Sequence, residues 1–241
     1  GPDMQIDVEA IESAITKKTK AIIPVHIAGS VVNMSRVMEI ATKHGLAVIE
    51  DGCQSLMAKR DGQTVGSWGI ATAYSMHPLK VINVWGDAGI VVTDDTEMDR
   101  KLRLLRNHGL RNRNEMEMLG YNSRLDSIQA VVGKKILSTI DWIISQRRAN
   151  ADFYTQAFSD IPEIEIPRIE PNIEHVYLLY ILFIKNRDEL LNHCLKNGIE
   201  AKVHYPIPLY CQDALKHLGY KHGDFPETDR QAQQGITFPV D

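Results

Sequence analysis

The sequence predicts an α/β domain with a mostly parallel sheet and crossover helices, followed by a smaller α+β domain. Three observations support this prediction. A strand–helix–strand succession occupies residues 21–51, two further apolar strands follow at 71–76 and 89–93, and the pattern changes after Ile161. A strand, a helix and a second strand in this order are typical of a right-handed crossover between parallel strands.

The first strand–helix–strand unit has clear boundaries. The β-branched run AIIPVHI covers residues 21–27, and the following segment MSRVMEIATKHG has helical spacing that ends at Gly45. The segment LAVIED then predicts a buried strand that ends at Asp51. Because open α/β sheets bind ligands at the carboxyl ends of their strands, we expect Asp51 to lie at a ligand-binding edge.

The strands ATAYSM at 71–76 and GIVVT at 89–93 extend this pattern, with the glycine-bearing turn WGDAG before the second of them. Residues 96–107 are predicted to be helical, and one long helix is predicted from Ser123 to about Ala157. We expect the first domain to give way to the second inside that helix. The expected domains are therefore residues 1–146 and 147–241.

The second domain begins with a different composition. The proline-bearing connection IPEIEIPRIEP leads to a predicted strand at 176–184, a helix at 187–198 and a strand at 200–205. This arrangement is typical of an α+β unit rather than of further parallel crossovers.

Composition excludes several classes of function. The chain has 241 residues, 44% of them hydrophobic and 24% charged, which is typical of a globular protein with a filled core. A net charge of -4 argues against a dedicated nucleic-acid-binding protein. The longest apolar run, VYLLYILFI, is too short for a membrane-spanning helix. Three widely spaced cysteines without a CxxC pair favour a reducing cytoplasm. We therefore expect small-molecule partners.

One lysine–carboxylate pair points to a particular chemistry. Lys80 closes the stretch YSMHPLK, 29 positions after Asp51. A lysine amine can hold the aldehyde of pyridoxal phosphate as a Schiff base, and a carboxylate can keep the pyridine nitrogen protonated. Taken alone, Lys80 could be a surface lysine and Asp51 a helix cap. The pair at the end of neighbouring strands indicates a pyridoxal-phosphate enzyme.

Several short motifs occur together in a fixed order. They are PVH-x-x-G at residues 24–29, ED-x-x-Q at 50–54, S-x-x-x-x-K at 75–80, RNHG at 106–109 and GYNSR-L-x-x-x-QA at 120–130. With these motifs the sequence resembles, over nearly its whole length, the DegT/DnrJ/EryC1/StrS family of pyridoxal-phosphate-dependent sugar aminotransferases. The resemblance implies the fold-type-I transferase architecture for the α/β domain.

The resemblance implies roles for residues around the cofactor. Lys80 would carry the cofactor and move the proton between substrate and cofactor carbons, and Asp51 would pair with the ring nitrogen. Gln54 would lie near the phenolic oxygen. Cys53 stands where the family has a small residue, and it is expected against the ring face. Each of these residues also has a purely structural alternative; Gln54, for example, could be an ordinary loop amide.

Further cofactor contacts are implied for Ser75, Asn122 and His26. Ser75 resembles the serine that donates to the cofactor phosphate, although a buried serine can also bond only to backbone. Asn122 resembles an asparagine that reaches the phosphate in the neighbouring subunit, which implies a homodimer with shared sites. His26 is a cofactor-binding candidate, or else a hydrogen-bonded histidine of the core.

Three residues are candidates for substrate contact: Tyr121, Arg124 and His175. Tyr121 and Arg124 could bind the carboxylate of an amino donor or a sugar hydroxyl, and Arg124 could instead form an ion pair at a helix start. His175 belongs to an H-x-Y segment that approaches the sugar in the family. No set of ligands indicates a metal site, and we expect none.

The resemblance predicts transfer of an amino group, with glutamate as the expected donor, to a keto-sugar that is nucleotide-linked or phosphorylated. Two alternatives remain: a sugar dehydratase of the same family, which is understood to carry a histidine in place of Lys80, and a catalytically silent fragment or regulatory subunit. Family members carry a segment before the position of Gly1, with a phosphate-binding turn, and a final helix. The sequence is therefore expected to match the central and small-domain portions of such an enzyme.

Overall fold

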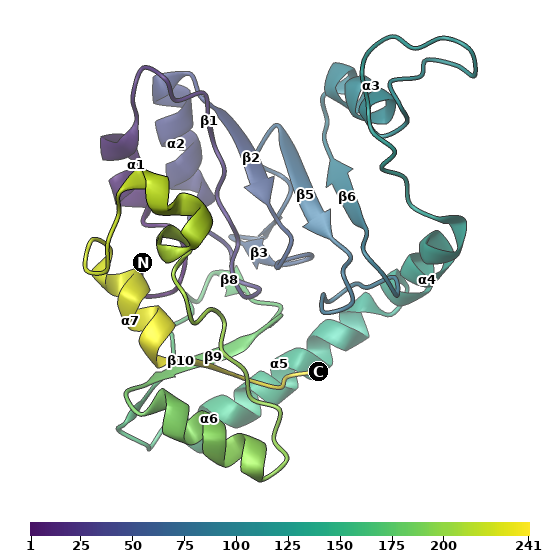
Figure 1. Ribbon diagram of the computed structural model, residues 1–241. Helices are drawn as coiled ribbons and strands as arrows, with labels where there is room; N and C mark the ends of the chain where they lie inside the picture. The colour runs from purple at the N-terminus through teal and green to yellow at the C-terminus, as the bar shows by residue number, and fades with distance from the viewer.

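The computed structural model describes residues 1–241 and contains a four-stranded sheet in the order β1-β2-β5-β6. Its strands are β1 (Ala21–Ile22), β2 (Ala47–Asp51), β5 (Ala71–Ser75) and β6 (Gly89–Val92). The first three strands are parallel, and β6 runs antiparallel to β5. The predicted α/β class with a mostly parallel sheet is confirmed. Figure 1 shows the four strands side by side, with the carboxyl ends of β2 and β5 directed toward α5 (Ile140–Phe158).

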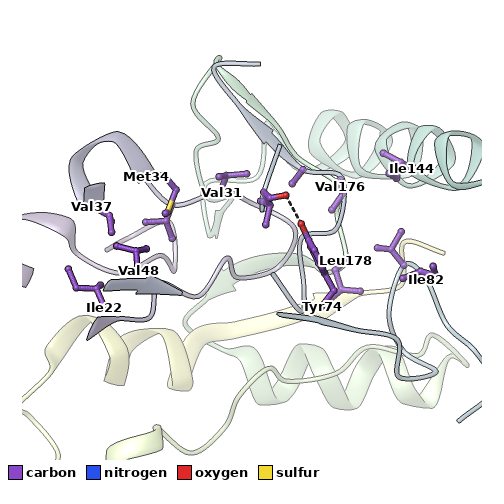
Figure 2. Close-up of a cluster of buried hydrophobic side chains, with 14 of the residues drawn as sticks. Ile22, Val31, Met34, Val37, Val48, Tyr74, Ile82, Ile144, Val176 and Leu178 are labelled. Atoms are coloured by element: carbon purple, nitrogen blue, oxygen red, sulfur yellow. Dashed lines mark hydrogen bonds between the residues drawn. The ribbon is translucent and has the colours of Figure 1, made fainter. Parts of the chain in front are cut away.

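The helices α1 (Val8–Ala14) and α2 (Met34–His44) lie beside β1 (Figure 1). The Asn33 side chain accepts the Arg36 N–H at the start of α2, and Gly45 ends the helix in a left-handed conformation. The residues of α2 that recur at helical spacing enter the main hydrophobic core: Met34, Val37, Ile40 and Ala41. Figure 2 shows part of this core, in which the Tyr74 hydroxyl donates to the Val65 carbonyl.

The first strand is shorter than predicted. Residues 21–27 were expected to pair throughout, whereas β1 ends at Ile22. Pro24 has no N–H to donate, and the chain rejoins the sheet only at the single bridge between Val25 and Asp51. The chain continues as an irregular segment over His26–Ser30, and this segment passes the end of β2.

The single long helix predicted over residues 123–157 was wrong. The structure has two helices, α4 (Ser127–Leu137) and α5, separated by Ser138 and Thr139. Both hydroxyls turn back to main-chain carbonyls three residues earlier, and Thr139 leaves the helical conformation. Asp126 and Gln129 form a capping box, which explains why α4 starts later than predicted.

The C-terminal part contains a three-stranded antiparallel sheet, in the order β10-β9-β7, that packs with helices. Its strands are β7 (Ile164–Glu165), β9 (Tyr180–Ile184) and β10 (Gly235–Phe238). Its helices are α6 (Arg187–Lys196), α7 (Pro226–Gln234), and the 3-10 turns η1 (Leu209–Cys211) and η2 (Asp213–Leu218). A separate cluster of buried side chains, centred on Tyr180, Leu182 and Ile236, forms between these elements.

Two predicted strands of this part are shorter in the structure. The strand predicted at 176–184 begins only at Tyr180, because the N–H groups of Val176 and Leu179 donate to Gly29 and Ala28 instead. The strand predicted at 200–205 is reduced to one bridge between Lys202 and Thr237. Pro206 and Pro208 follow it and offer no N–H to a longer ladder.

The remaining elements lie at the margins of the main sheet. A second small sheet contains β3 (Lys59–Arg60), β4 (Gln63–Thr64) and β8 (Ile173–Glu174), and α3 (Thr96–Leu105) follows β6. Residues 106–126 form an irregular arm that projects beyond α3 (Figure 1). None of the helices is both long and apolar enough to cross a bilayer.

Gly29 allows the irregular segment after β1 to touch the segment before β9. Its φ is +104°, and a Cβ there would lie 2.7 Å from the Tyr177 nitrogen and 2.8 Å from the Leu178 nitrogen. Side chains tolerate neither this φ nor these distances. This contact joins the end of the main sheet to the C-terminal part of the chain.

Replacing Gly29 with alanine is expected to lower the free energy of unfolding by about 3 kcal/mol, because strain at positive φ adds to the clash with the main chain. Gly62→Ala is the matched control: its φ is +77°, but a Cβ there would meet nothing within 4 Å. It should cost only about 1 kcal/mol. Equal losses in urea denaturation would contradict the proposed role of the contact.

Candidate active site

Asp51 and Ser75 lie at the carboxyl ends of adjacent parallel strands. Asp51 ends β2 opposite Ala73, and Ser75 ends β5. The Asp51 Oδ1 atom accepts the N–H of Cys53 at 3.0 Å, which leaves Oδ2 without a partner in the chain. Both residues are half-buried. The edge of the sheet thus presents a fixed carboxylate and a hydroxyl toward the same side of the molecule.

Lys80 lies on the turn that follows β5. Its N–H donates to the His77 carbonyl at 2.9 Å, which closes the turn 77–80. The side chain is half-buried, and the amine takes part in none of the hydrogen bonds or ion pairs of the structure. A lysine amine without a carboxylate partner, partly removed from water, is available for covalent chemistry.

Cys53 links Lys80 and Asp51 electrostatically. Burial and the neighbouring Asp51 carboxylate raise the pKa of the Cys53 thiol to about 11, while the charge of Lys80 acts in the opposite direction. The thiol also lies 3.7 Å from the Ala73 carbonyl. The structure therefore brings together Lys80, Asp51, Cys53 and Ser75, and it keeps the thiol in its neutral form.

Gln54 and Ser75 retain free donor groups. The Gln54 Oε1 atom accepts the Ala28 N–H at 2.8 Å, so its amide nitrogen keeps both protons for another acceptor. The Ser75 hydroxyl accepts the His77 N–H at 3.3 Å and keeps its own proton. Each side chain is fixed through its oxygen and can donate to a ligand.

Glu50, which was not among the predicted site residues, is a buried carboxylate on the opposite face of the same strand. Glu50 precedes Asp51 in β2, and successive strand residues point to opposite faces. Its side chain is fully buried and accepts five hydrogen bonds of 2.9–3.2 Å, from His26, Gly66, Trp68, Gly69 and Thr72. The acidic pair at the strand end was visible in the sequence, but not its set of donors.

The hydrogen bonds of Glu50 overcome the cost of burying it. Burial alone disfavours the ionised form, but the bonds from His26 and three backbone N–H groups lower the pKa below its ordinary value of 4.5. The carboxylate is thus charged at neutral pH. It ties β2 to the turn 66–69 and to β5.

His26 belongs to this buried network and not to the open edge of the sheet. It has 0% exposure; its Nδ1 accepts the Val32 N–H at 3.1 Å and its Nε2 lies 3.2 Å from Glu50. The backbone donor fixes Nδ1 as the acceptor, so Nε2 carries the proton. Both nitrogens are already used inside the protein, as expected for the core histidine that the sequence left open as an alternative.

Tyr121, Asn122 and Arg124 lie on the projecting arm. Arg124 donates to the Asn122 side chain at 3.1 Å and to Asn107 at 3.3 Å, and Tyr121 is 73% exposed. Asn122 and Arg124 line a polar hollow with Asp87. None of the three lines the pocket that contains Lys80.

His175 lies in a different cavity from Lys80. Its Nδ1 accepts the Tyr177 N–H at 2.9 Å, and burial together with the charge of Arg148 lowers its pKa to about 3. It is therefore neutral. The cavity has a volume of about 440 Å³ and is lined from the segment after β1 and from β9.

The pocket beside Lys80 has a volume of about 420 Å³ and is closed on its other side by the C-terminal part of the chain. Arg147, Lys202 and His204 line it together with Lys80, and none of the three was among the predicted site residues. Burial, followed by the charges of Lys202 and Lys80, lowers the pKa of His204. Two carboxylates also line the pocket: Glu200 lies 2.6 Å from Lys202, and Asp241 lies 3.9 Å from Arg147. The pocket thus carries charges of both signs around a neutral imidazole, and the Lys80 amine is its cation without a carboxylate partner.

The model of the DegT/DnrJ/EryC1/StrS aminotransferase family matches residues 1–241, so the chain belongs to this family. A pleiotropic regulatory protein of Geobacillus stearothermophilus is 38% identical over 98% of this chain and 64% of its own. The dTDP-3-amino-3,4,6-trideoxy-alpha-D-glucose transaminase of Micromonospora megalomicea is 36% identical over 99% of this chain and 65% of its own. The chain therefore spans about two thirds of the length of these relatives.

The structure is also similar to solved aminotransferase structures. DesV of S. venezuelae, solved in complex with a ketimine intermediate, superposes with a TM-score of 0.96 and 34% identity, over 100% of this chain and 65% of its own. The fold-type-I architecture implied by the sequence is confirmed by this likeness.

Glu50→Gln is expected to lower the free energy of unfolding at pH 7 by about 3 kcal/mol, because an amide cannot accept from every donor that surrounds Glu50. The folded-state pKa of Glu50 is depressed, so its contribution is present above 4.5 and is lost as the pH falls through the folded value. The gap between wild type and variant should narrow on acidification.

Glu174→Gln serves as the control in the same denaturation series, since Glu174 is half-exposed and meets Lys59 at 3.3 Å. It should change stability by less than about 1 kcal/mol. A pH-independent loss for Glu50→Gln, or a loss no larger than the control's, would count against the network.

Proposed function

We propose that this protein is a pyridoxal-phosphate-dependent aminotransferase that moves an amino group from an amino acid, with glutamate as donor, to a nucleotide-linked keto-sugar. The observation that carries the proposal is the unpaired amine of Lys80 beside Asp51 and Cys53 at the carboxyl edge of β2 and β5. Family membership supports the reaction class, and the named transaminase relative supports a nucleotide-sugar acceptor.

The donor and acceptor groups at this edge fit the cofactor. Lys80 offers a free amine, Asp51 a free Oδ2, Gln54 a free amide nitrogen and Ser75 a free hydroxyl proton. These are the groups needed to hold an aldehyde, a ring nitrogen, a phenolic oxygen and a phosphate. Cys53 is small enough to lie against the face of the cofactor ring, and its neutral thiol adds no second negative charge beside Asp51.

When bound, pyridoxal phosphate supplies an electron-withdrawing ring that stabilises negative charge on the reacting carbon. Asp51 Oδ2 would hold a proton on the ring nitrogen, and its orientation is fixed by the N–H of Cys53. Lys80 Nζ would anchor the group covalently and then, once released, take and return a proton as a general base and acid. Ser75 and Gln54 would orient the group by donating hydrogen bonds.

We place the anionic parts of donor and acceptor in the pocket beside Lys80, where Arg147 supplies positive charge and lies 3.9 Å from Asp241. Lys202 is already paired with Glu200 at 2.6 Å. Arg147 is almost fully buried and is held by the carbonyls of Tyr177 and Leu178, so its position is fixed before a ligand arrives. His175 would face the sugar only from the neighbouring cavity.

We propose a homodimer in the cytoplasm in which the arm of one subunit reaches the site of the other. Asn122 would contact the partner's cofactor phosphate, and Tyr121 and Arg124 would contact the substrate there. The exposure of Tyr121, and the absence of all three residues from the lining of the Lys80 pocket, support a role in another subunit's site. All four residues of β6, the edge strand of the main sheet, are also exposed, which leaves this edge open to a second subunit.

A second candidate is a regulatory protein without transfer activity, which the name of the Geobacillus relative favours. The two candidates can be told apart by turnover, because an aminotransferase converts a keto-sugar and a regulatory protein need not. A dehydratase is disfavoured because Lys80 occupies the lysine position. A screen of 3-keto and 4-keto nucleotide sugars with glutamate separates the three: amino-sugar product supports transfer, a deoxygenated product supports dehydration, and no product supports regulation.

Lys80→Ala is expected to abolish the absorbance band of the lysine-bound cofactor in a titration with pyridoxal phosphate, because the other lysine of the pocket, Lys202, is held in an ion pair with Glu200 at 2.6 Å. Lys216→Ala is the control: this lysine is exposed on η2 and pairs with Asp213 at 2.7 Å. It should retain the wild-type band. A band of wild-type size in Lys80→Ala would refute the assignment.

Asp51→Asn is expected to keep the covalent attachment but to lower the rate of amino transfer about 100-fold or more, because the ring nitrogen loses its anionic partner. Asp160→Asn, on the exposed turn after α5, should leave the rate unchanged. The comparison uses single-turnover conversion of glutamate. A near-normal rate in Asp51→Asn would show that this carboxylate has only a structural role.

A further inference from the structure

A cysteine, a histidine and an aspartate lie in sequence outside the proposed site and are brought together by η1, the loop after η2 and α7. The Cys211 Sγ atom lies 3.6 Å from the His222 Nε2 atom, and the His222 Nδ1 atom lies 3.1 Å from the Asp229 Oδ1 atom. Nothing in the proposed amino transfer uses these residues. The series thiol, imidazole and carboxylate has the spacing of a nucleophile, a base and an orienting group.

Asp229 is held as a carboxylate. It accepts the Tyr210 hydroxyl and, at 2.7 Å, the Gly223 N–H; these bonds and His222 lower its pKa below the ordinary value of 3.8. An ionised oxygen opposite Nδ1 requires that nitrogen to carry the proton. The other nitrogen, Nε2, is therefore an acceptor directed at the thiol.

The other two cysteines are in environments that disfavour a thiolate. Burial and Asp51 raise the pKa of Cys53 to about 11, and burial raises the pKa of Cys194, which is 2% exposed. Cys211 is half-exposed, and the His222 side chain is 71% exposed, so both can be approached from solvent. Cys211 alone combines access with a base.

We propose that Cys211 is a site of covalent modification by low-molecular-weight disulfides, with His222 as its base and Asp229 as the positioning residue. The Cys211 proton passes to His222 Nε2, and the sulfur attacks one sulfur of the disulfide. A new S–S bond forms to Cys211 as the bond within the reagent breaks, and the departing thiolate takes the proton from His222. One mixed disulfide and one free thiol result; the reagent disulfide is the oxidant, since the Cys211 sulfur is oxidised as the departing sulfur is reduced to a thiol.

Packing contacts between η1 and α7 hold the three groups in place within the C-terminal part of the chain. Tyr210 precedes Cys211 and packs against Phe225 with ring centroids 4.9 Å apart, and Phe225 is the residue before α7. Aromatic contact and the Asp229 hydrogen bond hold η1 against α7. The geometry of the three groups is thus set by packing rather than by chance encounters of mobile side chains.

The test measures the rate at which each cysteine of the folded protein reacts with 2-hydroxyethyl disulfide, with acid quenching and peptide mapping. Cys211 should react about tenfold or more faster than Cys53 and Cys194. His222→Ala should remove most of that advantage, and added imidazole should restore part of it. His217→Ala, an exposed histidine on η2 whose Nδ1 lies 3.0 Å from the Ala214 carbonyl, should react like wild type.

Asp229→Asn should lower the Cys211 rate to between those of wild type and His222→Ala, with an unchanged circular dichroism spectrum. Imidazole rescue separates a base from a merely structural histidine, because a structural defect would not respond to a free base. Equal rates at the three cysteines, or an unchanged Cys211 rate in His222→Ala, would overturn the proposal. So would loss of rate without any rescue.

Discussion

The carboxylate of Glu50 accepts five hydrogen bonds in the interior of the protein, and the geometry of the site depends on it. Three of the donors are backbone N–H groups of the turn 66–69, one is the ring of His26, and one is the hydroxyl of Thr72 on β5. A buried charge is tolerated only when its hydrogen bonds are satisfied. The surrounding segments therefore have little freedom to move apart.

The position of Asp51 follows from that constraint. Since neighbouring residues of a strand face opposite sides, anchoring Glu50 inward turns Asp51 outward at the end of β2. Thr72 extends the same anchor to β5, from which the chain enters the turn of Lys80. The reactive edge is thus a consequence of a buried ion on the other face of the same two strands.

The sequence predicted the part of the site that depends on strand order. Asp51, Ser75 and Lys80 follow adjacent parallel strands, so their proximity followed from the crossover pattern and the length of the turn. It did not predict Glu50, His204 or Arg147, because their partners come from distant segments that no local pattern connects. The break between α4 and α5 was missed for a related reason: Ser138 and Thr139 fit a helical pattern until their hydroxyls bond to the backbone. The roles of the site residues, and the domain boundary at 146–147, stay predictions.

The most direct test of the central claim is to locate the cofactor-bearing lysine. The protein is loaded with pyridoxal phosphate, reduced with borohydride and digested, and the modified peptide is identified by mass spectrometry. A single phosphopyridoxyl group is expected on Lys80. Modification of another lysine, spread over several exposed lysines, or absent altogether would contradict it.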